Sequence, residues 1–184
     1  MHLKLNLKHL VSNIKIQYYK SPVGKLVIGA YKEKICLCDW LYRKKREVID
    51  SRIKGYLEAD FIFSKSEVID QTIIQLKEYF NKERKTFNIP ILLCGSEFQK
   101  LVWTKLMNVP YGRTTSYLEL SKNIKNINAI RAVANANGAN GISIIIPCHR
   151  IIGVNGGLTG YSGGLKAKKK LLELEAPFIQ TTLF

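Results

Sequence analysis

The feature that most constrains this chain is an apolar run that ends at a proline, a cysteine and a histidine. Residues 142–146 (ISIII) lead directly into Pro147-Cys148-His149-Arg150, and a loop dense in glycine follows. This pattern predicts a buried strand that delivers a thiol into a turn, with an imidazole beside it. A thiolate is a strong nucleophile, and an adjacent base can help to form it. A buried structural cysteine would also explain these residues, because free cysteine is among the most buried residue types.

Composition indicates a globular protein with a polyanionic partner. The 184 residues can bury a real core as one domain or two, and 46% hydrophobic with 23% charged residues is ordinary. The formal net charge is +15, and between Phe98 and Leu172 eleven Lys and Arg residues accompany one acid, Glu119. Such a charge favours nucleic acid or an anionic surface as partner, although a basic surface without a partner is the alternative.

The four cysteines indicate a reducing compartment rather than a disulfide scaffold. Cys36 and Cys38 lie two apart on a predicted strand, so we expect them on one face of it. A free nucleophilic thiol requires reducing conditions, which favours the cytoplasm, near the nucleoid in a bacterium or archaeon, or the nucleus in a eukaryote. The sequence has neither a signal-peptide core nor an apolar run long enough to span a membrane, so no membrane association is expected.

The first half of the chain predicts a small α/β domain over residues 1–94. Alternating apolar residues predict an antiparallel sheet, and a capping-box spacing from Ser64 to Glu67 predicts a helix that runs to about Lys82. We interpret the basic run at 43–46 as a solvated loop. The predicted strands lie at residues 14–18, 25–31, 34–41 and 86–93.

The second half, residues 95–184, predicts a mainly helical domain. Capping residues open one helix after Ser96 and a second, short helix after Ser116. A polar linker leads to an alanine-rich helix at 128–137, with Gly138 as its C-terminal stop. Two short helices joined by a tight turn in a basic region are typical of a helix-turn-helix, although two ordinary core helices would give the same pattern.

Residues 95–175 resemble the O6-alkylguanine-DNA alkyltransferase family, the methylated-DNA–protein-cysteine methyltransferases. The resemblance rests on the Pro147-Cys148-His149-Arg150 box and on flanking pieces in the family's order and spacing. These pieces are FQ at 98–99 with VW at 102–103, VPYG at 109–112, TSY at 115–117, AIRAV at 129–133, Asn140, GYSGGL at 160–165 and KKLLELE at 169–175. The first 90 or so residues are less similar, mainly through YKSPVG at 19–24. The family implies a ribonuclease H-like N-terminal domain and a winged-helix-like C-terminal domain.

The resemblance implies direct-reversal DNA repair by a methylated-DNA–protein-cysteine S-methyltransferase. An alkyl group passes by SN2 attack from O6 of guanine in duplex DNA to Cys148, after the base has left the stack. The thioether product is inert, so each molecule reacts once. No cofactor is implied, and the expected partner is double-stranded DNA containing O6-alkylguanine, bound by a monomer. The range of alkyl groups and activity on O4-alkylthymine stay open.

The resemblance also implies roles for the neighbours of Cys148. His149 would act as a base through a water, and Glu175 would orient it in the manner of a third triad member. Glu175 could instead be a surface acid paired with the lysines at 166–170. Asn140 would link the helix-turn-helix to the active-site turn, although Asn-Gly also forms turns without any such role.

Further residues would hold the DNA and the flipped base. Tyr117 would crowd a phosphate, and Arg131 would fill the gap in the stack, although Arg131 could simply contact a phosphate. Tyr161 and Ser162, in a loop that could be merely flexible, would wall the guanine pocket. The carbonyls of Cys148 and Ile151 would accept hydrogen bonds from the exocyclic amine.

The chain departs from the family pattern at two positions. Ala134 stands where the family usually has glycine, which concerns the fit of the helix in the minor groove. Gly141 stands where the family usually has proline, which concerns the rigidity of the active-site turn. Some members hold zinc, but we predict no metal site here. The only candidate ligands are His2, His9, Cys36 and Cys38.

Three other functions explain parts of the sequence. An alkyltransferase-like protein that only binds lesions would lack the acceptor, so Cys148 argues against it. A helix-turn-helix regulator with a redox-sensing cysteine would need polar, base-reading side chains on the helix at 128–137, which offers few. A cysteine hydrolase is disfavoured because His149 directly follows Cys148, which is poor geometry for a dyad.

Overall fold

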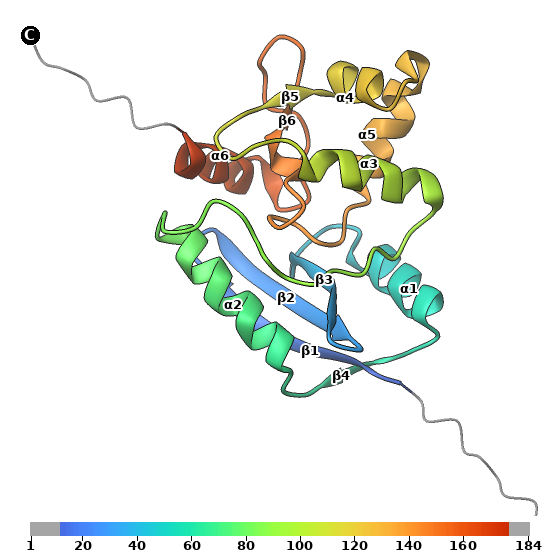
Figure 1. Cartoon of the computed structure of the whole chain (residues 1–184), viewed down its shortest axis with the longest axis vertical. Coiled ribbons are helices and arrows are strands. Elements are labelled where there is room, and N and C mark those ends of the chain that lie inside the picture. The colour runs from blue at the N-terminus through green and yellow to red at the C-terminus, as the bar shows by residue number, and fades with distance from the viewer. Residues whose placement is uncertain (1–11, 177–184) are drawn as a thin grey trace, which may run out of the picture.

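The N-terminal half is built on a four-stranded sheet with the strand order β3-β2-β1-β4. The structure is a computed structural model that describes residues 12–176 (Figure 1). Strands β1 (Ile14–Ser21), β2 (Gly24–Tyr31) and β3 (Lys34–Trp40) form an antiparallel meander, whereas β4 (Phe61–Phe63) pairs parallel with β1. The predicted α/β class is confirmed, but the sheet is mixed rather than purely antiparallel, because an intervening helix carries the chain back before β4.

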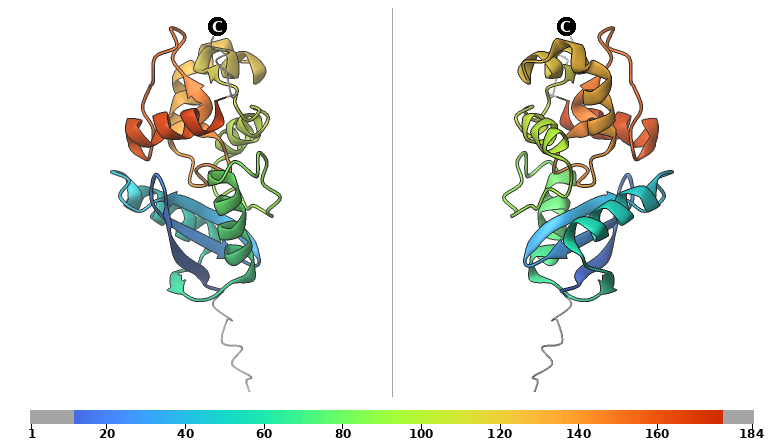
Figure 2. Two further views of the ribbon diagram at one scale, coloured as in Figure 1. Left: turned by 90° about the vertical axis from the view of Figure 1, so that its left-hand side faces the viewer. Right: turned by 90° about the vertical axis from the view of Figure 1, so that its right-hand side faces the viewer.

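That intervening helix, α1 (Arg46–Leu57), was not predicted from the sequence. It covers one face of the sheet, while α2 (Glu67–Phe80) covers the other (Figures 1 and 2). Only Ile49 and Ile53 of α1 are buried, so its apolar periodicity is weak. Helix α2 was predicted, but it begins after Ser66 and no capping box forms at its start.

A bulge in β3 overturns the expectation that Cys36 and Cys38 share a face. Gly29 pairs with Leu37 and Ala30 pairs with Ile35, so Cys36 is the extra residue. Cys36 consequently packs in the core under α1, and Cys38 packs in the core under α2. Within residues 12–176, no three His, Cys, Asp or Glu side chains are grouped to hold a metal ion, and His2 and His9 lie outside this range.

Two predicted strands are reduced to isolated bridges. In segment 86–93 only Ile91 bridges, to Ile35, because the neighbouring proline cannot donate to a ladder. In segment 142–146, Ile142 bridges Cys38, but the chain then turns at Ile144, whose φ is 73°. This segment is buried as expected, but it is a loop, so the prediction of a strand leading to the cysteine is wrong.

The C-terminal half is helical (Figure 1). The Ser96 side chain caps α3 (Glu97–Met107) in a full capping box, and the Ser116 side chain caps α4 (Tyr117–Asn123). A short 3-10 turn at 127–129 precedes α5 (Ile130–Gly138), which packs against both earlier helices in a helix-turn-helix arrangement. Gly138 is the last residue of α5 and has no left-handed backbone, so it is not the stop that its position suggested.

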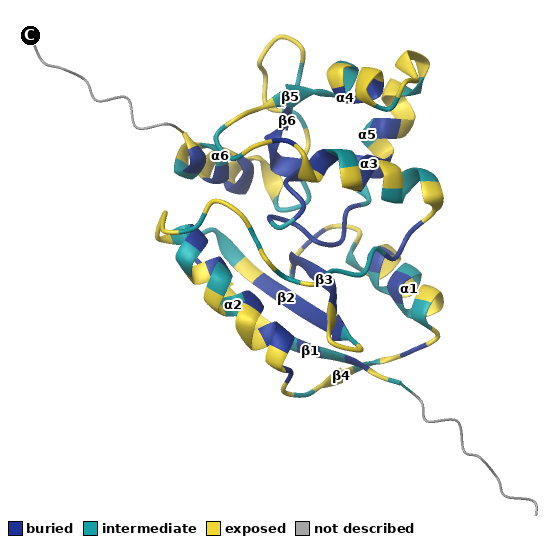
Figure 3. Cartoon of the chain, viewed as in Figure 1, coloured by how far each residue is buried: buried dark blue, intermediate teal, exposed yellow. Residues whose placement is uncertain are grey.

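The remaining elements surround the predicted reactive cysteine. Strands β5 (Thr115–Ser116) and β6 (Ile151–Ile152) pair in parallel, η2 (Cys148–Arg150) is a single 3-10 turn, and α6 (Gly164–Glu175) closes the fold. One apolar core runs from the sheet and α2 into the C-terminal helices (Figure 3). Cys148 belongs to this core. The helices of residues 12–176 include none long and apolar enough to cross a membrane.

Candidate active site

Cys148 lies at the start of η2, at the junction between the two halves of the chain. It is only 3% exposed, and the side-chain amide of Asn140 donates a 3.1 Å hydrogen bond to its sulfur. Burial raises the pKa of the Cys148 thiol, and the hydrogen bond from Asn140 opposes that shift only in part. The resting cysteine is therefore a thiol, and it needs a base before it can act as a nucleophile.

Asn140 organises the buried loop that leads to Cys148. Its amide nitrogen donates to the carbonyls of Ile142 and Ile146, and its side-chain oxygen accepts from the Ile142 N–H at 2.9 Å. These bonds supply partners to backbone groups that a neighbouring strand would otherwise satisfy. This explains why the apolar run forms a loop, and it ties the end of α5 to the cysteine.

His149 and Glu175 form a fully buried pair. Nε2 of His149 lies 2.8 Å from Oε1 of Glu175, and the same carboxylate accepts hydrogen bonds from Arg150 Nε and Tyr79 Oη at 2.8 and 2.7 Å. Burial opposes the ionisation of Glu175, but the hydrogen bonds from His149 and Arg150 outweigh it and lower its pKa to about 2. Glu175 is thus a buried anion, and the alternative of a surface acid paired with lysines is excluded by its 2% exposure.

The geometry leaves one nitrogen of His149 free to act as a base. Burial lowers the pKa of His149 despite the adjacent carboxylate, so the ring is neutral at neutral pH. With the Nε2 proton directed to Glu175, Nδ1 carries the lone pair, and Nδ1 has no hydrogen-bond partner among the described residues.

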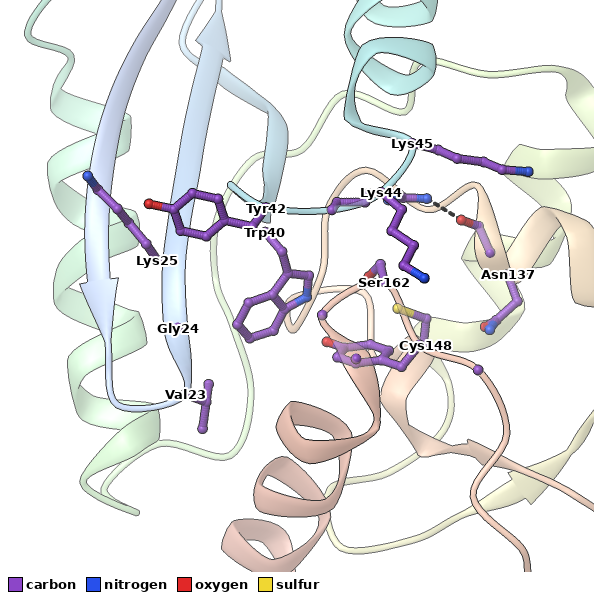
Figure 4. A pocket seen from close by; sticks show the side chains of 16 residues that line it. Val23, Gly24, Lys25, Trp40, Tyr42, Lys44, Lys45, Asn137, Cys148 and Ser162 are labelled. Atoms are coloured by element: carbon purple, nitrogen blue, oxygen red, sulfur yellow. Dashed lines mark hydrogen bonds between the residues drawn. The ribbon is translucent and has the colours of Figure 1, made fainter.

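A pocket of about 620 Å³ opens beside Cys148, a size suited to a nucleobase. Figure 4 shows the side chains of Cys148 and Ser162 facing Trp40 and Lys44 across this space. The glycine-rich loop and the end of α5 form one wall, and β2, β3 and the loop after β3 form the other. Nε1 of Trp40 and Oη of Tyr161 are buried polar atoms without a partner in residues 12–176. Both residues line the pocket.

The other predicted DNA-contacting residues lie on the helical side. Tyr117 is in the first turn of α4, with its hydroxyl 3.4 Å from Thr159 Oγ1. Arg131 is exposed in the first turn of α5. The Ile151 carbonyl, predicted to face the base, already accepts a hydrogen bond from the buried ammonium of Lys168.

Sequence reasoning missed several residues of this site. Tyr79 lies among the apolar residues of the predicted helix that runs to about Lys82, and Lys168 is one of the lysines at 166–170, so neither pattern signals a buried polar contact. Arg43 was placed in a solvated loop, which is wrong, because it is 9% exposed and paired with buried Asp39. Trp40 carried no signal beyond its place at the end of a strand.

Comparison with known proteins agrees with this geometry. Residues 14–93 match the ribonuclease-like domain and residues 97–177 match the DNA binding domain of 6-O-methylguanine DNA methyltransferase. A methylated-DNA–protein-cysteine methyltransferase of Methanosarcina acetivorans is 41% identical over 158 residues, which is 85% of this chain and 95% of the relative. One of the same name from Mycobacterium leprae is 39% identical, over 89% of this chain and 93% of the relative.

Solved structures show the same architecture. The crystal structure of the Mycobacterium tuberculosis O6-methylguanine methyltransferase has a TM-score of 0.75 at 34% identity, covering 90% of this chain and 96% of that chain. A structure of Mycobacterium tuberculosis OGT in complex with DNA gives 0.75 at 35% identity, covering 89% and 96%. With both domain matches in chain order and near-complete coverage of its relatives, the chain belongs to the O6-methylguanine-DNA methyltransferase family, the methylated-DNA–protein-cysteine methyltransferases.

Proposed function

We propose that the protein repairs O6-alkylguanine in duplex DNA by transferring the alkyl group to Cys148. Membership of the family supports DNA as partner and alkyl transfer to a protein cysteine as the reaction. The observation that carries the assignment to Cys148 is its position. Of the four cysteines, Cys148 alone lines the large pocket, and it has a donor at its sulfur and a histidine–glutamate pair next to it.

The reaction follows from these contacts. A water between Nδ1 of His149 and the sulfur would pass the Cys148 proton to the imidazole, and Glu175 would stabilise the imidazolium that forms. The thiolate then attacks the alkyl carbon, a C–S bond forms, and the bond from that carbon to O6 breaks. The electron pair of the broken bond leaves with guanine, which takes up a proton. A thioether has no route back to a thiol here, so each molecule acts once.

Access to the base requires that it leave the duplex, at a cost of about a few kcal/mol. Tyr117 and Arg131 lie in the first turns of the two helices of the helix-turn-helix, which suits roles at the DNA backbone and in the vacated stack. Tyr161 and Ser162 both line the pocket, which suits recognition of the extruded purine. The Ile151 carbonyl could serve the base only in competition with Lys168.

The protein is further proposed to act as a monomer in a reducing compartment. All four cysteines are free and buried, and their chemistry requires that they stay reduced.

The test is intact-protein mass spectrometry after incubation with duplex DNA containing O6-methylguanine, followed by peptide mapping. We expect one added methyl group per molecule, located on Cys148 and absent from Cys148→Ala. Binding that prefers the lesion without any mass gain would instead identify a recognition protein. A methyl group on Cys36, Cys38 or Cys94 would refute the assignment to Cys148.

A further inference from the structure

A buried ion pair at the end of β3 joins the N-terminal half to the active-site loop. Nη1 of Arg43 lies 2.7 Å from Oδ2 of Asp39, and the two side chains are 7% and 0% exposed. Buried charges are tolerated only when hydrogen bonds satisfy their remaining atoms. Here those bonds come from the other half of the chain, which makes the pair a connection between the two halves.

Each member of the pair reaches the segment between α5 and the cysteine loop. Arg43 Nη1 donates to the Asn140 carbonyl at 2.7 Å, and Arg43 Nη2 donates to the Gly138 carbonyl. Asp39 Oδ1 accepts from the Ser143 hydroxyl at 2.9 Å. One guanidinium and one carboxylate thus contact three positions of the segment 138–143.

The backbone of β3 forms hydrogen bonds with the same segment. The Cys38 N–H donates to the Gly141 carbonyl at 2.9 Å, and the Cys38 carbonyl accepts from the Ser143 N–H at 2.6 Å. Helix α1 also packs closely on this segment, because a Cβ added at Gly141 would lie 3.2 Å from Ile49 Cγ2. The glycine at this position therefore fits the close approach of α1.

We propose that Asp39 and Arg43 are positioning residues for alkyl transfer, because they hold the Asn140 main chain so that its side chain donates to Cys148. The inference rests on the proposed function and deepens it, since it gives the N-terminal half a part in the reaction. Neither residue touches the sulfur. Their effect passes through Asn140, whose amide lies 3.1 Å from Cys148 Sγ.

A direct role in DNA binding is less compatible with the contacts of Arg43. Although Arg43 borders the pocket, both of its terminal nitrogens donate to protein acceptors. The neighbouring Lys44 and Lys45 also border the pocket and are exposed, so they are better placed to meet a phosphate.

The substitution that tests the proposal is Arg43→Lys, which keeps the positive charge beside Asp39. A single ammonium cannot reproduce the planar fork that holds a carboxylate and two carbonyls. We expect the first-order rate constant for methyl transfer, at saturating duplex DNA, to fall on the order of 10- to 100-fold. The DNA concentration at half-maximal rate should not change. Transfer from the free base O6-methylguanine should fall by the same factor.

Arg46→Lys is the matched control. Arg46 pairs with Asp50 at 2.7 Å with the same four-residue spacing, and its ion pair stays within α1. We expect its transfer rate to remain within about twofold of the wild-type rate, since the exchange keeps the charge and the Arg46 side chain pairs with Asp50 rather than with segment 138–143.

A second measurement needs neither DNA nor a correct proposed function. Iodoacetamide labels Cys148, and peptide mapping across a pH series gives the apparent pKa of its thiol. If Asp39 and Arg43 hold Asn140 against the sulfur, the charge-conserving changes Arg43→Lys and Asp39→Glu should both shift the Cys148 labelling profile to higher pH, because both weaken the hydrogen bond that lowers the pKa of the thiol. Labelling of Cys36 and Cys94 should be unchanged.

Two results would overturn the positioning role of Asp39 and Arg43. One is an unchanged transfer rate constant and labelling profile in folded Arg43→Lys, including the case in which only the DNA concentration for half-maximal rate rises. The other is an equal loss in Arg46→Lys, which would reflect stability alone. If the wild-type protein gains no methyl group, the proposed function fails. The labelling profiles alone then decide whether Asp39 and Arg43 position Asn140. Asp39→Glu, which keeps the negative charge, supplies the profile if Arg43→Lys does not fold.

Discussion

The hydroxyl of Tyr79 donates a 2.7 Å hydrogen bond to Oε1 of Glu175, the same oxygen that lies 2.8 Å from Nε2 of His149. Tyr79 is in α2 of the N-terminal half, whereas Glu175 ends α6, and both are buried. The N-terminal half therefore helps to hold the carboxylate that orients the proposed base. It also gives Glu175 a neutral donor in addition to Arg150.

Tyr79→Phe should destabilise the protein without abolishing transfer. The change removes one hydrogen bond to a buried charge, and such bonds contribute about 1.5–3 kcal/mol. Arg150 still donates twice to the carboxylate, so Glu175 stays in place and the transfer rate should change only a few-fold. Urea denaturation at pH 7 measures the loss as a lower midpoint with an unchanged slope.

Tyr111→Phe is the control for this measurement, because the Tyr111 hydroxyl bonds a neutral acceptor, the Leu174 carbonyl, at 3.2 Å. Its loss should be smaller, about 0.5–1.5 kcal/mol. Equal losses in the two variants would mean that the charge of Glu175 adds nothing to the Tyr79 bond.

The rate of transfer should stay level through neutral pH and fall only in acid. Burial lowers the pKa of His149 from its ordinary value of 6.5, so the neutral imidazole persists below that pH. Protonation of Nδ1 then removes the base, and the rate should fall about tenfold per pH unit below the His149 pKa. Single-turnover rates from pH 5 to 9 at saturating DNA test this. A half-maximal rate above pH 6.5 would show that another group controls the reaction.

Both buried groups should make the fold less stable in acid. The His149 pKa is lower in the folded than in the unfolded state. Its contribution to the free energy of unfolding is therefore fully present above about pH 6.5 and is lost as the pH falls below that value. The pKa of Glu175 falls from 4.5 to about 2, so its contribution, roughly 3 kcal/mol, is lost between those pH values. Urea midpoints of the wild type and Glu175→Gln should therefore converge as the pH approaches 2.

The candidate reactive residues could be identified in the sequence because their chemistry is local. Cys148 and His149 are neighbours, and the box that contains them is specific to one family. Strands β1 to β3 and the helices capped by Ser96 and Ser116 were also predictable, since alternation and serine caps are encoded within a few residues. Strands β4, β5 and β6 were not predicted, because two or three residues are too few to show alternation. The helix-turn-helix followed from the helix after Ser116, the alanine-rich helix and the linker between them.

The missed features depend on contacts between distant segments. Helix α1 buries only two isoleucines, so its helical period was too faint to detect. The run 142–146 is apolar like a strand, but Asn140 satisfies its backbone groups and allows it to remain a loop. Arg43 looked like a surface charge because its partners, the carbonyls of Gly138 and Asn140, lie almost a hundred residues away in the chain.

Arg131→Ala should impair transfer from duplex DNA more than transfer from single strands. If Arg131 fills the gap left by the extruded base, its loss leaves the cost of unstacking uncompensated, and that cost is about a few kcal/mol. We expect on the order of a tenfold fall with duplex substrate and little change with a single-stranded oligonucleotide, where no stack needs repair. Comparison of single-turnover rates on the two substrates measures this difference.

Arg113→Ala, an exposed charge in the same half, is the control for general electrostatic attraction. It should weaken binding to duplex and single strands alike, in a salt-dependent manner. An equal fall on both substrates in Arg131→Ala would assign Arg131 to phosphate contact.

Gly163→Ala should distort the pocket. A Cβ at this position would lie 2.6 Å from Cδ2 of Trp40, and an indole ring packed on the core cannot move aside cheaply. We expect a loss of stability of about 1–3 kcal/mol and slower transfer, because Trp40 would shift into the space meant for the base. Gly160→Ala is the control, since a Cβ there meets nothing within 4 Å.

The double substitution Trp40→Leu with Gly163→Ala separates the causes, because removing the indole should relieve the clash. Urea midpoints of the two single variants and the double variant would then show a coupling energy well above zero. Additive losses would mean that the alanine acts on the loop backbone instead of on Trp40.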